Sequence, residues 1–331
     1  MTDRTVHQRD TRAAGAPPRV SVIMIFLDGE AFIDEAITSV MAQSMQDFEL
    51  LLCDDGSTDG STAIARHWAS QHPGRVRYLQ HEGHANRGMS ATRNLGLAAA
   101  RGEFVAFIDA DDVWRPRKLA EQIAVMEAHA ELALVGGTVR YWRSWAGGED
   151  VLVPTGHVQN RVVRPPEASL AVYPLGSAPA PCPSDILLRR DAVDAVGGFE
   201  EHFTGARQIY EDQGFLAKLY LARPVFFSDA VWLDYRQHPD SWVTTVTRDG
   251  RYDEVRRYFL TWFDGHLRRL PDEPPHAVRV AVSRALRPYR RPVAHALLSS
   301  PGRLATACHR RLRRLRRALR RRVRGTSGAG G

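Results

Sequence analysis

The feature that most limits the fold of this chain is an alternation of short apolar runs with helical periodicity between residues 20 and 109. A short unbroken apolar run suits a strand that is buried on both faces of a sheet. Strands and helices that alternate at this pitch predict an α/β fold with a largely parallel central sheet. We expect strands at Val20–Phe26, Phe48–Cys53, Val76–Leu79 and Phe104–Ile108, and helices over residues 32–41, around residues 64–68 and over residues 88–100.

The second half of the chain is less regular. Residues 141–183 are rich in Pro, Gly and Trp and have no sustained period, which favours a functional insertion or loop region. We expect strands over residues 132–139, 186–188 and 231–235, a helix over residues 211–221, and helices beyond residue 249 that are interrupted at residues 271–275. The predicted organisation is one domain over residues 19–245, with halves at 19–126 and 127–245, and a helical extension over residues 246–299.

Composition places the chain among globular proteins and sets aside several classes. Its apolar share of 44% and charged share of 25% are ordinary for a folded domain. No apolar run approaches the roughly 20 residues that a membrane-spanning helix needs. Residues 1–18 are polar, so we expect a disordered lead-in rather than a signal peptide. The three cysteines, Cys53, Cys182 and Cys308, are widely spaced, which fits a reducing cytoplasm.

The net charge of +7 comes from one segment near the C-terminus. Ten arginines and no acid lie between residues 310 and 324, and without them the chain has a net charge of −3. Residues 300–325 place apolar side chains at helical spacing among these arginines, the pattern of a helix that lies on an anionic membrane surface. The alternatives are a solvated or partner-bound helix, or nucleic-acid binding, which the lack of interleaved aromatic residues makes less favoured.

This basic helix predicts a cytoplasmic protein that is peripheral on the inner face of the cell membrane. Residues 326–331 are expected to be a disordered tail.

Two acidic clusters follow predicted parallel strands directly. Asp54 and Asp55 follow the second strand, and Asp109–Asp112 follows the strand at residues 104–108. Open α/β sheets bind ligands at the carboxyl ends of their strands, and clustered carboxylates call for a cation or for hydroxyl donors. The alternative is that these aspartates only form turns and helix caps. An EF-hand loop starting at Asp55 is excluded, because its twelfth position is Arg66 instead of Glu.

Motifs of other α/β enzymes are absent from the sequence. No GxGxxG follows the first strand, and neither GxxxxGK[ST] nor GxSxG occurs anywhere. Dinucleotide oxidoreductases, P-loop nucleotidases and serine hydrolases of the nucleophile-elbow type therefore lose their main support.

An ordered set of motifs resembles family 2 glycosyltransferases of the GT-A fold. The set consists of the strand VSVIM, the segments SVMAQS and DFEL, the turn DDGSTDGS, the segments NRG and ATRN, and FIDADD followed by Pro116 and Leu119. Each motif alone is weak, but their order and spacing are specific. The resemblance is strong over residues 19–126 and looser to about residue 242. It implies an inverting transferase that moves a sugar from a nucleotide diphosphate sugar, expected to be a UDP-sugar, to a glycan or lipid-linked acceptor in cell-surface polysaccharide or glycoconjugate synthesis.

The resemblance also assigns roles in donor binding. The end of the first strand and the DDGS turn would hold the nucleoside, with Asp55 at the uracil or ribose and Arg93 near the nucleotide. The expected nucleotide-sugar-binding residues are Phe26, Asp28, Glu30, Asp55, Arg93, Asp109 and Ala110. One departure is visible at Leu27, where the family usually has an aromatic or Thr/Tyr element, so the fit to the base is altered there.

The Asp-x-Asp run would bind Mn²⁺ or Mg²⁺ that bridges the diphosphate. Asp111 is the preferred metal ligand, Asp112 could exchange roles with it, and Asp109 is expected at the ribose or the metal. His238, in the run YRQHPDS, is a further candidate for the metal. A bound cation stabilises the charge that the departing diphosphate gains.

Glu211 and Asp212 open a predicted helix and resemble the catalytic acidic pair of the family. Asp212 is the preferred base for the acceptor hydroxyl and Glu211 the second choice. The alternative for the pair is helix capping. For the whole chain, the alternative function is a catalytically inactive GT-A-like protein that binds membrane or nucleic acid through its arginine-rich tail.

Overall fold

The computed structural model describes residues 16–239 and 241–290. The predictions for residues 300–325 and 326–331 lie outside the described residues, as do residues 1–15 of the expected N-terminal lead-in. By its internal contacts the chain divides after Ala281, and the fold of the first unit is what positions the site. In the part that is described, no helix is both long enough and apolar enough to cross a membrane.

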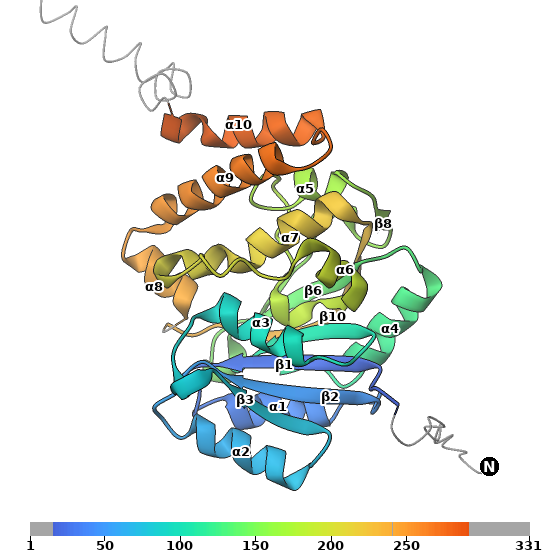
Figure 1. The fold of residues 1–331 in the computed structure, drawn as a ribbon, viewed down its shortest axis with the longest axis vertical. Helices are drawn as coiled ribbons and strands as arrows, with labels where there is room; N and C mark the ends of the chain where they lie inside the picture. The colour runs from blue at the N-terminus through green and yellow to red at the C-terminus, as the bar shows by residue number, and fades with distance from the viewer. Residues whose placement is uncertain (1–15, 240, 291–331) are drawn as a thin grey trace, which may run out of the picture. The chain divides into compact units, whose positions relative to one another are not determined.

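The first half forms the parallel sheet that the alternation predicts. Strands β1 (Val20–Phe26), β2 (Phe48–Asp54), β3 (Val76–Gln80) and β4 (Phe104–Asp109) lie in the order β3-β2-β1-β4, and each neighbouring pair is parallel (Figure 1). Every residue of β1 and β2 is buried, as expected for strands covered on both faces. The registers pair Phe26 with Asp54 and Ile25 with Asp109, so the carboxyl ends of β1, β2 and β4 meet at one edge.

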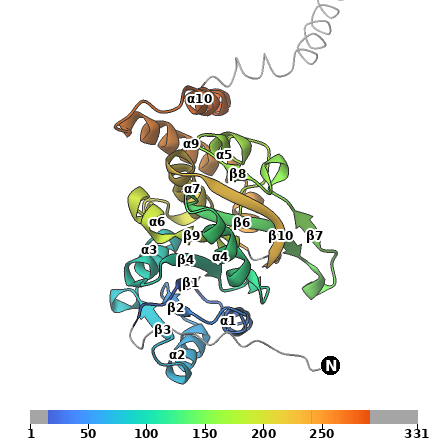
Figure 2. The ribbon, with the colours of Figure 1, turned by 90° about the vertical axis from the view of Figure 1, so that its right-hand side faces the viewer.

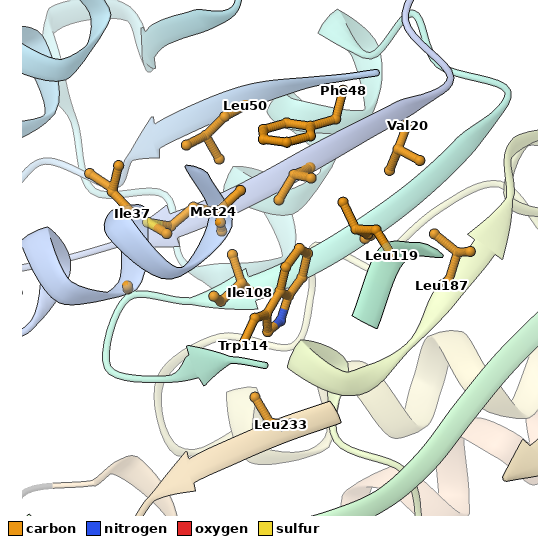
Figure 3. Packing of buried hydrophobic residues seen from close by; sticks show 14 of the residues in the cluster. Val20, Met24, Ile37, Phe48, Leu50, Ile108, Trp114, Leu119, Leu187 and Leu233 are labelled. Atoms are coloured by element: carbon orange, nitrogen blue, oxygen red, sulfur yellow. The ribbon is translucent and has the colours of Figure 1, made fainter. Parts of the chain in front are cut away.

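Helices cover both faces of this parallel sheet. Helices α1 (Ile33–Met41) and α2 (Ser61–Gln71) pack on one face, and α3 (Met89–Ala99) packs on the other (Figures 1 and 2). On the first face Met24 and Leu50 pack with Ile37 of α1 in one buried cluster (Figure 3). The same cluster continues past β4 through Trp114 to Leu187 and Leu233, so it joins the two halves.

The second half extends the sheet with mixed pairing. After β5 (Val113–Trp114) and α4 (Lys118–Ala128), strands β6 (Leu134–Trp142), β9 (Leu187–Arg189) and β10 (Val225–Arg236) continue the order as β4-β9-β6-β10-β5. Strand β9 is antiparallel to both β4 and β6, whereas β6 and β10 are parallel. The α/β prediction is confirmed, but "largely parallel" holds only for the first half, because β9 runs against its two neighbours.

The irregular region of residues 141–183 contains only short elements. These are β7 (Val151–Val153), β8 (Val162–Val163), α5 (Glu167–Ala171) and several single turns of 3₁₀ helix, the last of which, η4, begins at Pro183 and ends at Asp185. Strand β7 pairs with the carboxyl end of β6, and β8 pairs with the start of β10. The predicted irregular loop region is therefore confirmed, whereas its role as a functional insertion remains a prediction. The periodicity does not indicate its short strands.

Helices α6 (Arg190–Val196), η5 (Gly205–Tyr210) and α7 (Glu211–Ala222) precede β10, and α8 (Trp242–Arg248), α9 (Tyr252–Arg269) and α10 (His276–Arg290) follow it. The break predicted at residues 271–275 separates α9 from α10. The last strand begins at Val225, six residues before the predicted start at Val231, because its first part pairs with β6 and β8.

Candidate active site

The carboxyl ends of the central strands bring the predicted acidic residues to one edge of the sheet. Strand β6 has the same direction as β4, since both are antiparallel to β9, and β10 is parallel to β6. The ends of β1, β2, β4, β6 and β10 therefore share this edge (Figure 1). Ligands of open α/β sheets bind in this position.

Asp54 and Asp55 build the turn that follows β2. Asp54 is fully buried, and its carboxylate accepts hydrogen bonds from the backbone N–H groups of Gly56 (3.1 Å) and Ser57 (2.8 Å). Asp55 accepts hydrogen bonds from the backbone N–H groups of Arg87 (2.7 Å) and Gly88 (3.0 Å). The DDGS turn is thereby joined to the loop before α3. The expected contact of Asp55 with the nucleoside remains a prediction.

Gly56 is required in this turn by its backbone conformation and by its neighbours. Its φ is +87°, and a Cβ atom would lie 2.8 Å from the backbone nitrogen of Asn86. The close approach of two loops thus explains the glycine of the DDGS motif.

Three residues predicted to bind the donor lie at the end of β1 and stabilise the loops there. Phe26 is 4% exposed and its side chain belongs to the core, so direct contact of that side chain with a nucleotide is not supported. Asp28 accepts a hydrogen bond from the N–H of Thr58 (2.7 Å), and Glu30 accepts one from the N–H of Gly60 (3.0 Å). Both acids therefore join the loop after β1 to the turn after β2, and their predicted contact with the donor remains a prediction.

The acids of the Asp109–Asp112 run have different surroundings. Asp109 ends β4; its backbone N–H donates to Ser184 Oγ (3.0 Å), and one carboxylate oxygen lies 2.6 Å from Arg93 Nη2. Asp111 Oδ2 lies 2.9 Å from His238 Nε2. Ala110 is buried between them at 9% exposure.

Asp112 is the most enclosed of the run. It is fully buried and accepts a hydrogen bond from the backbone N–H of Arg236 (3.1 Å). Burial, with Asp111 and Asp109 nearby, raises the pKa of Asp112 well above its usual range. A buried carboxyl of this kind fits a positioning role better than the predicted exchange with Asp111 as a metal ligand.

Asp111 and His238 are the pair best suited to hold a divalent cation. A carboxylate oxygen and an imidazole nitrogen are ligands that Mn²⁺ accepts, and about a third of the Asp111 side chain is exposed. Adjacent ligands of an octahedral ion with bonds near 2.1 Å lie about 3 Å apart, which matches the observed 2.9 Å. Within the described residues no group of three His, Cys, Asp or Glu converges on one point. The pair therefore fits an ion whose coordination is completed by water and substrate phosphates.

The two acids at the start of α7 also differ. Glu211 is 2% exposed and lies 2.5 Å from Arg93 Nη1. Asp212 is partly exposed and accepts hydrogen bonds from the N–H of Gln213 (2.7 Å) and from its side-chain amide (3.1 Å). Burial raises the pKa of Asp212 to about 6 and raises that of Glu211 as well, although Arg93 opposes the shift of Glu211.

Arg93 joins the donor side of the site to the acidic pair. Its guanidinium pairs with Asp109 through Nη2 and with Glu211 through Nη1, and the residue is 2% exposed. The sequence places Arg93 near a nucleotide, whereas the structure shows it between two carboxylates that lie 102 residues apart along the chain. A guanidinium group can bind two carboxylates at once because its N–H donors point in fixed, divergent directions.

Asp212 also lines a cavity of about 160 Å³ at this edge. Most of the residues that line this cavity are not indicated by the sequence motifs, and the only signal for them is the proline content of residues 141–183. The cavity is lined by Gly137, Val139, Tyr141, Val153, Thr155, Pro179–Pro183, Asp212, Gln213 and Tyr235.

Comparison with known proteins defines the class to which this site belongs. The sequence model described as "Glycosyl transferase family 2" matches residues 21–197, more than half of the chain. The chain therefore belongs to glycosyl transferase family 2. The resemblance seen in its motifs is confirmed.

Individual relatives match over shorter stretches. The chain is 36% identical over 107 residues to the Escherichia coli UDP-Glc:α-D-GlcNAc-diphosphoundecaprenol β-1,3-glucosyltransferase WfgD, covering 32% of this chain and 40% of that protein. It spans 26–42% of the length of the first curated relatives that it matches.

Solved structures show the same fold. S. aureus TarS 1-349 in complex with UDP-GlcNAc superposes with a TM-score of 0.60 at 22% identity, covering 84% of this chain and 75% of that one. The Pyrobaculum calidifontis mannosyltransferase PcManGT in complex with GDP-Man and Mn²⁺ superposes with a TM-score of 0.53 at 20% identity, covering 88% and 81%. The GT-A fold expected from the sequence is thereby confirmed.

Proposed function

We propose that this protein is an inverting, metal-dependent glycosyltransferase that moves a sugar from a nucleotide diphosphate sugar to a hydroxyl group of its acceptor. The observation that carries the proposal is the Arg93 bridge. It joins Asp109 of the Asp-x-Asp run to Glu211, the neighbour of Asp212, within hydrogen-bond distance on both sides. The Asp-x-Asp run, which would hold the donor, and helix α7, which carries Asp212, therefore lie next to each other. A single displacement reaction requires donor and base to be close in this way.

In this proposal Asp212 acts as the general base. Its carboxylate lines the cavity, whereas Glu211 is held in the ion pair with Arg93. As the acceptor oxygen attacks the anomeric carbon, its proton passes to Asp212, and the bond between that carbon and the diphosphate oxygen breaks. One displacement from the face opposite the leaving group inverts the configuration at the anomeric carbon. A base whose pKa is near 6 is ionised at neutral pH and still accepts a proton.

Asp111 and His238 would hold Mn²⁺ or Mg²⁺, and the ion would stabilise the negative charge of the departing nucleoside diphosphate as a Lewis acid. Support comes from the oxygen and nitrogen donors that face each other at 2.9 Å. It also comes from PcManGT, which was solved with Mn²⁺ and GDP-Man. We further propose a UDP-sugar as the donor, supported by the UDP-GlcNAc complex of TarS and by the UDP-Glc in the name of WfgD.

We propose a lipid-linked or growing glycan acceptor on the basis of exposed apolar side chains at the active-site edge, which we call the apolar rim. Val151 and Leu152 of β7 are exposed to 43% and 58%, and Trp242 and Val243 of α8 to 40% and 47%. Val151 pairs with Tyr141 at the end of β6, and α8 follows the end of β10, so both parts of this apolar rim lie at the active-site edge. Exposed apolar side chains that gather beside a site mark an interaction surface.

An acceptor whose sugar is attached to a lipid fits both the cavity and the apolar rim, and WfgD by its name acts on a diphosphoundecaprenol-linked sugar. We also propose that the arginine-rich residues 300–325 bind an anionic membrane surface on the cytoplasmic side, where such acceptors are anchored. The alternative of a catalytically inactive protein is not favoured, because Asp111 faces His238 and Arg93 joins Asp109 to Glu211 at this edge.

Transfer assays with a panel of nucleotide sugars, with and without Mn²⁺, test the proposal. We expect turnover that requires the metal, and we expect Asp212→Asn to lower transfer by about 10²–10⁴-fold while donor affinity stays within about twofold. Glu82→Gln, at an exposed position in the turn of 3₁₀ helix after β3 (Glu82–His84), is the matched control and should leave transfer unchanged. Metal-independent turnover, or full transfer by Asp212→Asn, would contradict the mechanism.

A further inference from the structure

The end of β10 carries a buried arginine that is enclosed by aromatic rings. Arg236 is 4% exposed, and its Cζ atom lies 4.4 Å from the ring centroid of Trp142, 4.8 Å from that of Phe32 and 4.9 Å from that of Trp145. Phe32 immediately precedes α1, Trp142 ends β6, and Trp145 lies in the turn η2 (Ser144–Ala146). Two segments of the chain, one at Phe32 and one at residues 142–145, thus converge on one guanidinium.

The polar atoms of Arg236 are directed at the Asp-x-Asp turn. Its Nε donates to the backbone oxygen of Asp111 (2.8 Å), and its backbone N–H donates to Asp112 Oδ1 (3.1 Å). Nη2 pairs with Glu35 of α1 at 2.5 Å. The aromatic rings therefore pack around the guanidinium group of Arg236. The same group donates to the backbone of Asp111, the residue that faces His238.

His238 is fixed by the same aromatic residues. Its ring lies 5.5 Å from that of Phe32, and the Phe32 and Trp145 rings meet edge to face at 5.8 Å. The indole N–H of Trp145 donates to the backbone oxygen of Gln237 (3.2 Å), one residue before His238. Both members of the Asp111–His238 pair are thus held by one arginine–aromatic cluster, which we define as Phe32, Trp142, Trp145 and Arg236.

We propose that the arginine–aromatic cluster is a positioning device that keeps Asp111 and His238 facing each other at the separation a divalent cation needs. This inference rests on the proposed function, in which that pair holds the metal. Groups that orient metal ligands without touching the ion are typically worth 10–100-fold in metal affinity. A lysine at position 236 would keep the charge but could neither lie flat between rings nor donate in two fixed directions.

Titration of Mn²⁺ into the full-length chain in the presence of UDP, followed by the electron paramagnetic resonance signal of free Mn²⁺, tests this role. We expect Arg236→Lys to weaken Mn²⁺ binding by about 10–100-fold, while UDP affinity without metal changes less than about twofold. The paramagnetic ion should also quench part of the tryptophan fluorescence in the wild type, because Trp142 and Trp145 surround Arg236. That quenching should move to higher Mn²⁺ concentration in the variant.

Arg189→Lys is the matched control. Arg189 lies over the ring of Phe104 at 5.1 Å and pairs with Glu103, but it ends β9 beside the start of β4, at the opposite edge of the sheet. The Arg189→Lys substitution should leave Mn²⁺ affinity unchanged. Phe32→Leu, at a partly exposed position, keeps the test valid if Arg236→Lys does not fold, and we expect a few-fold loss of Mn²⁺ affinity from it.

Two outcomes are distinguishable. If the wild type binds Mn²⁺ and Arg236→Lys binds it equally well, or no worse than Arg189→Lys, the positioning role is overturned while the proposed function stands. If the wild type itself binds no Mn²⁺ with UDP present, the metal-dependent function fails, and the positioning role fails with it.

Discussion

The two halves of the domain achieve their folds in different ways. In the first half, β1 to β4 pair in parallel with one helix after each of β1, β2 and β3, so this half is built from a repeated unit of strand and helix. In the second half, a three-residue strand, β9, enters between β4 and β6 from a point more than 40 residues further along the chain than β6. The first half supplies a regular edge, and the second supplies the irregular walls of the cavity.

The proposed chemistry depends on residues from both halves. Arg93 and Asp109 belong to the first half, while Glu211, Asp212 and His238 belong to the second. A regular half gives fixed positions for the donor, and an irregular half can vary its loops to suit different acceptors. The largest effects should therefore come from residues that join the halves, and smaller ones from residues within a single half.

Removing the bridge between the halves should have the largest effect. We expect Arg93→Met to lower the free energy of unfolding by about 3–5 kcal/mol, because Asp109 and the buried Glu211 lose their common cation. Urea denaturation followed by circular dichroism measures this loss. Adding Glu211→Gln should recover part of it, since one of the unpaired charges is then absent. A loss below about 1 kcal/mol would mean that the halves do not depend on this bridge.

Matched glycine substitutions should show how differently the halves are packed. At Gly96 of α3 a Cβ would lie 2.4 Å from Ile23 and 3.1 Å from Cys53, so we expect Gly96→Ala to cost about 1–3 kcal/mol by overpacking. At Gly147 in the insertion nothing lies within 4 Å of the added Cβ, and only the φ of +82° opposes it, at a cost of about 1 kcal/mol. Thermal unfolding of both variants measures the difference, and equal losses would contradict it.

The pH profile of transfer should report a group of the second half. Since burial raises the pKa of Asp212 to about 6, the base becomes protonated as the pH falls through that value. We expect kcat to be level above pH 6 and to fall about tenfold for each pH unit below it. An unshifted aspartate, with a pKa near 3.9, would leave transfer unchanged down to about pH 5. A profile that is level between pH 5 and 8 would remove Asp212 as the base.

The smallest effect should come from the apolar rim. We expect Leu152→Ser to raise the KM for a lipid-linked acceptor a few-fold and to leave the KM for the donor unchanged, because Leu152 is 58% exposed and precedes Val153, which lines the cavity. Leu27→Ser, at the end of β1 in the first half, is the matched control and should leave the KM for the acceptor unchanged. Kinetics with the lipid-linked acceptor and with a short soluble analogue separate these outcomes. An equal loss with both acceptors would contradict a lipid contact.

The sequence predicts the first half well for a physical reason. The bounds of β1 coincide with the apolar run Val20–Phe26, because a strand covered on both faces must be apolar throughout. The last strand was predicted at residues 231–235 but begins at Val225, since its first part is defined by pairing with β6 and β8, which no local pattern records. The antiparallel direction of β9 is not predicted for the same reason, because it too depends on pairing with distant strands.

Within the site, the sequence indicates which segments form the site but not which role each of their side chains has. Asp109, Asp111 and Asp112 are the same residue type in one short run, so the sequence does not distinguish them. They differ in the structure because Arg93, His238 and Arg236 respectively lie against them. Each partner comes from a distant part of the chain, so local sequence alone does not predict these assignments.

The position of Ser184 in η4 limits where chimaeras between members of this family can be joined. Its hydroxyl accepts the backbone N–H of Asp109, and its carbonyl accepts the indole N–H of Trp114 (2.7 Å), so a turn from the second half supports the end of β4. A chimaera joined near residue 126 would separate this turn from the strand it supports. Exchange of acceptor specificity between relatives should therefore keep residues 183–185 together with the donor half and graft only the loops around them.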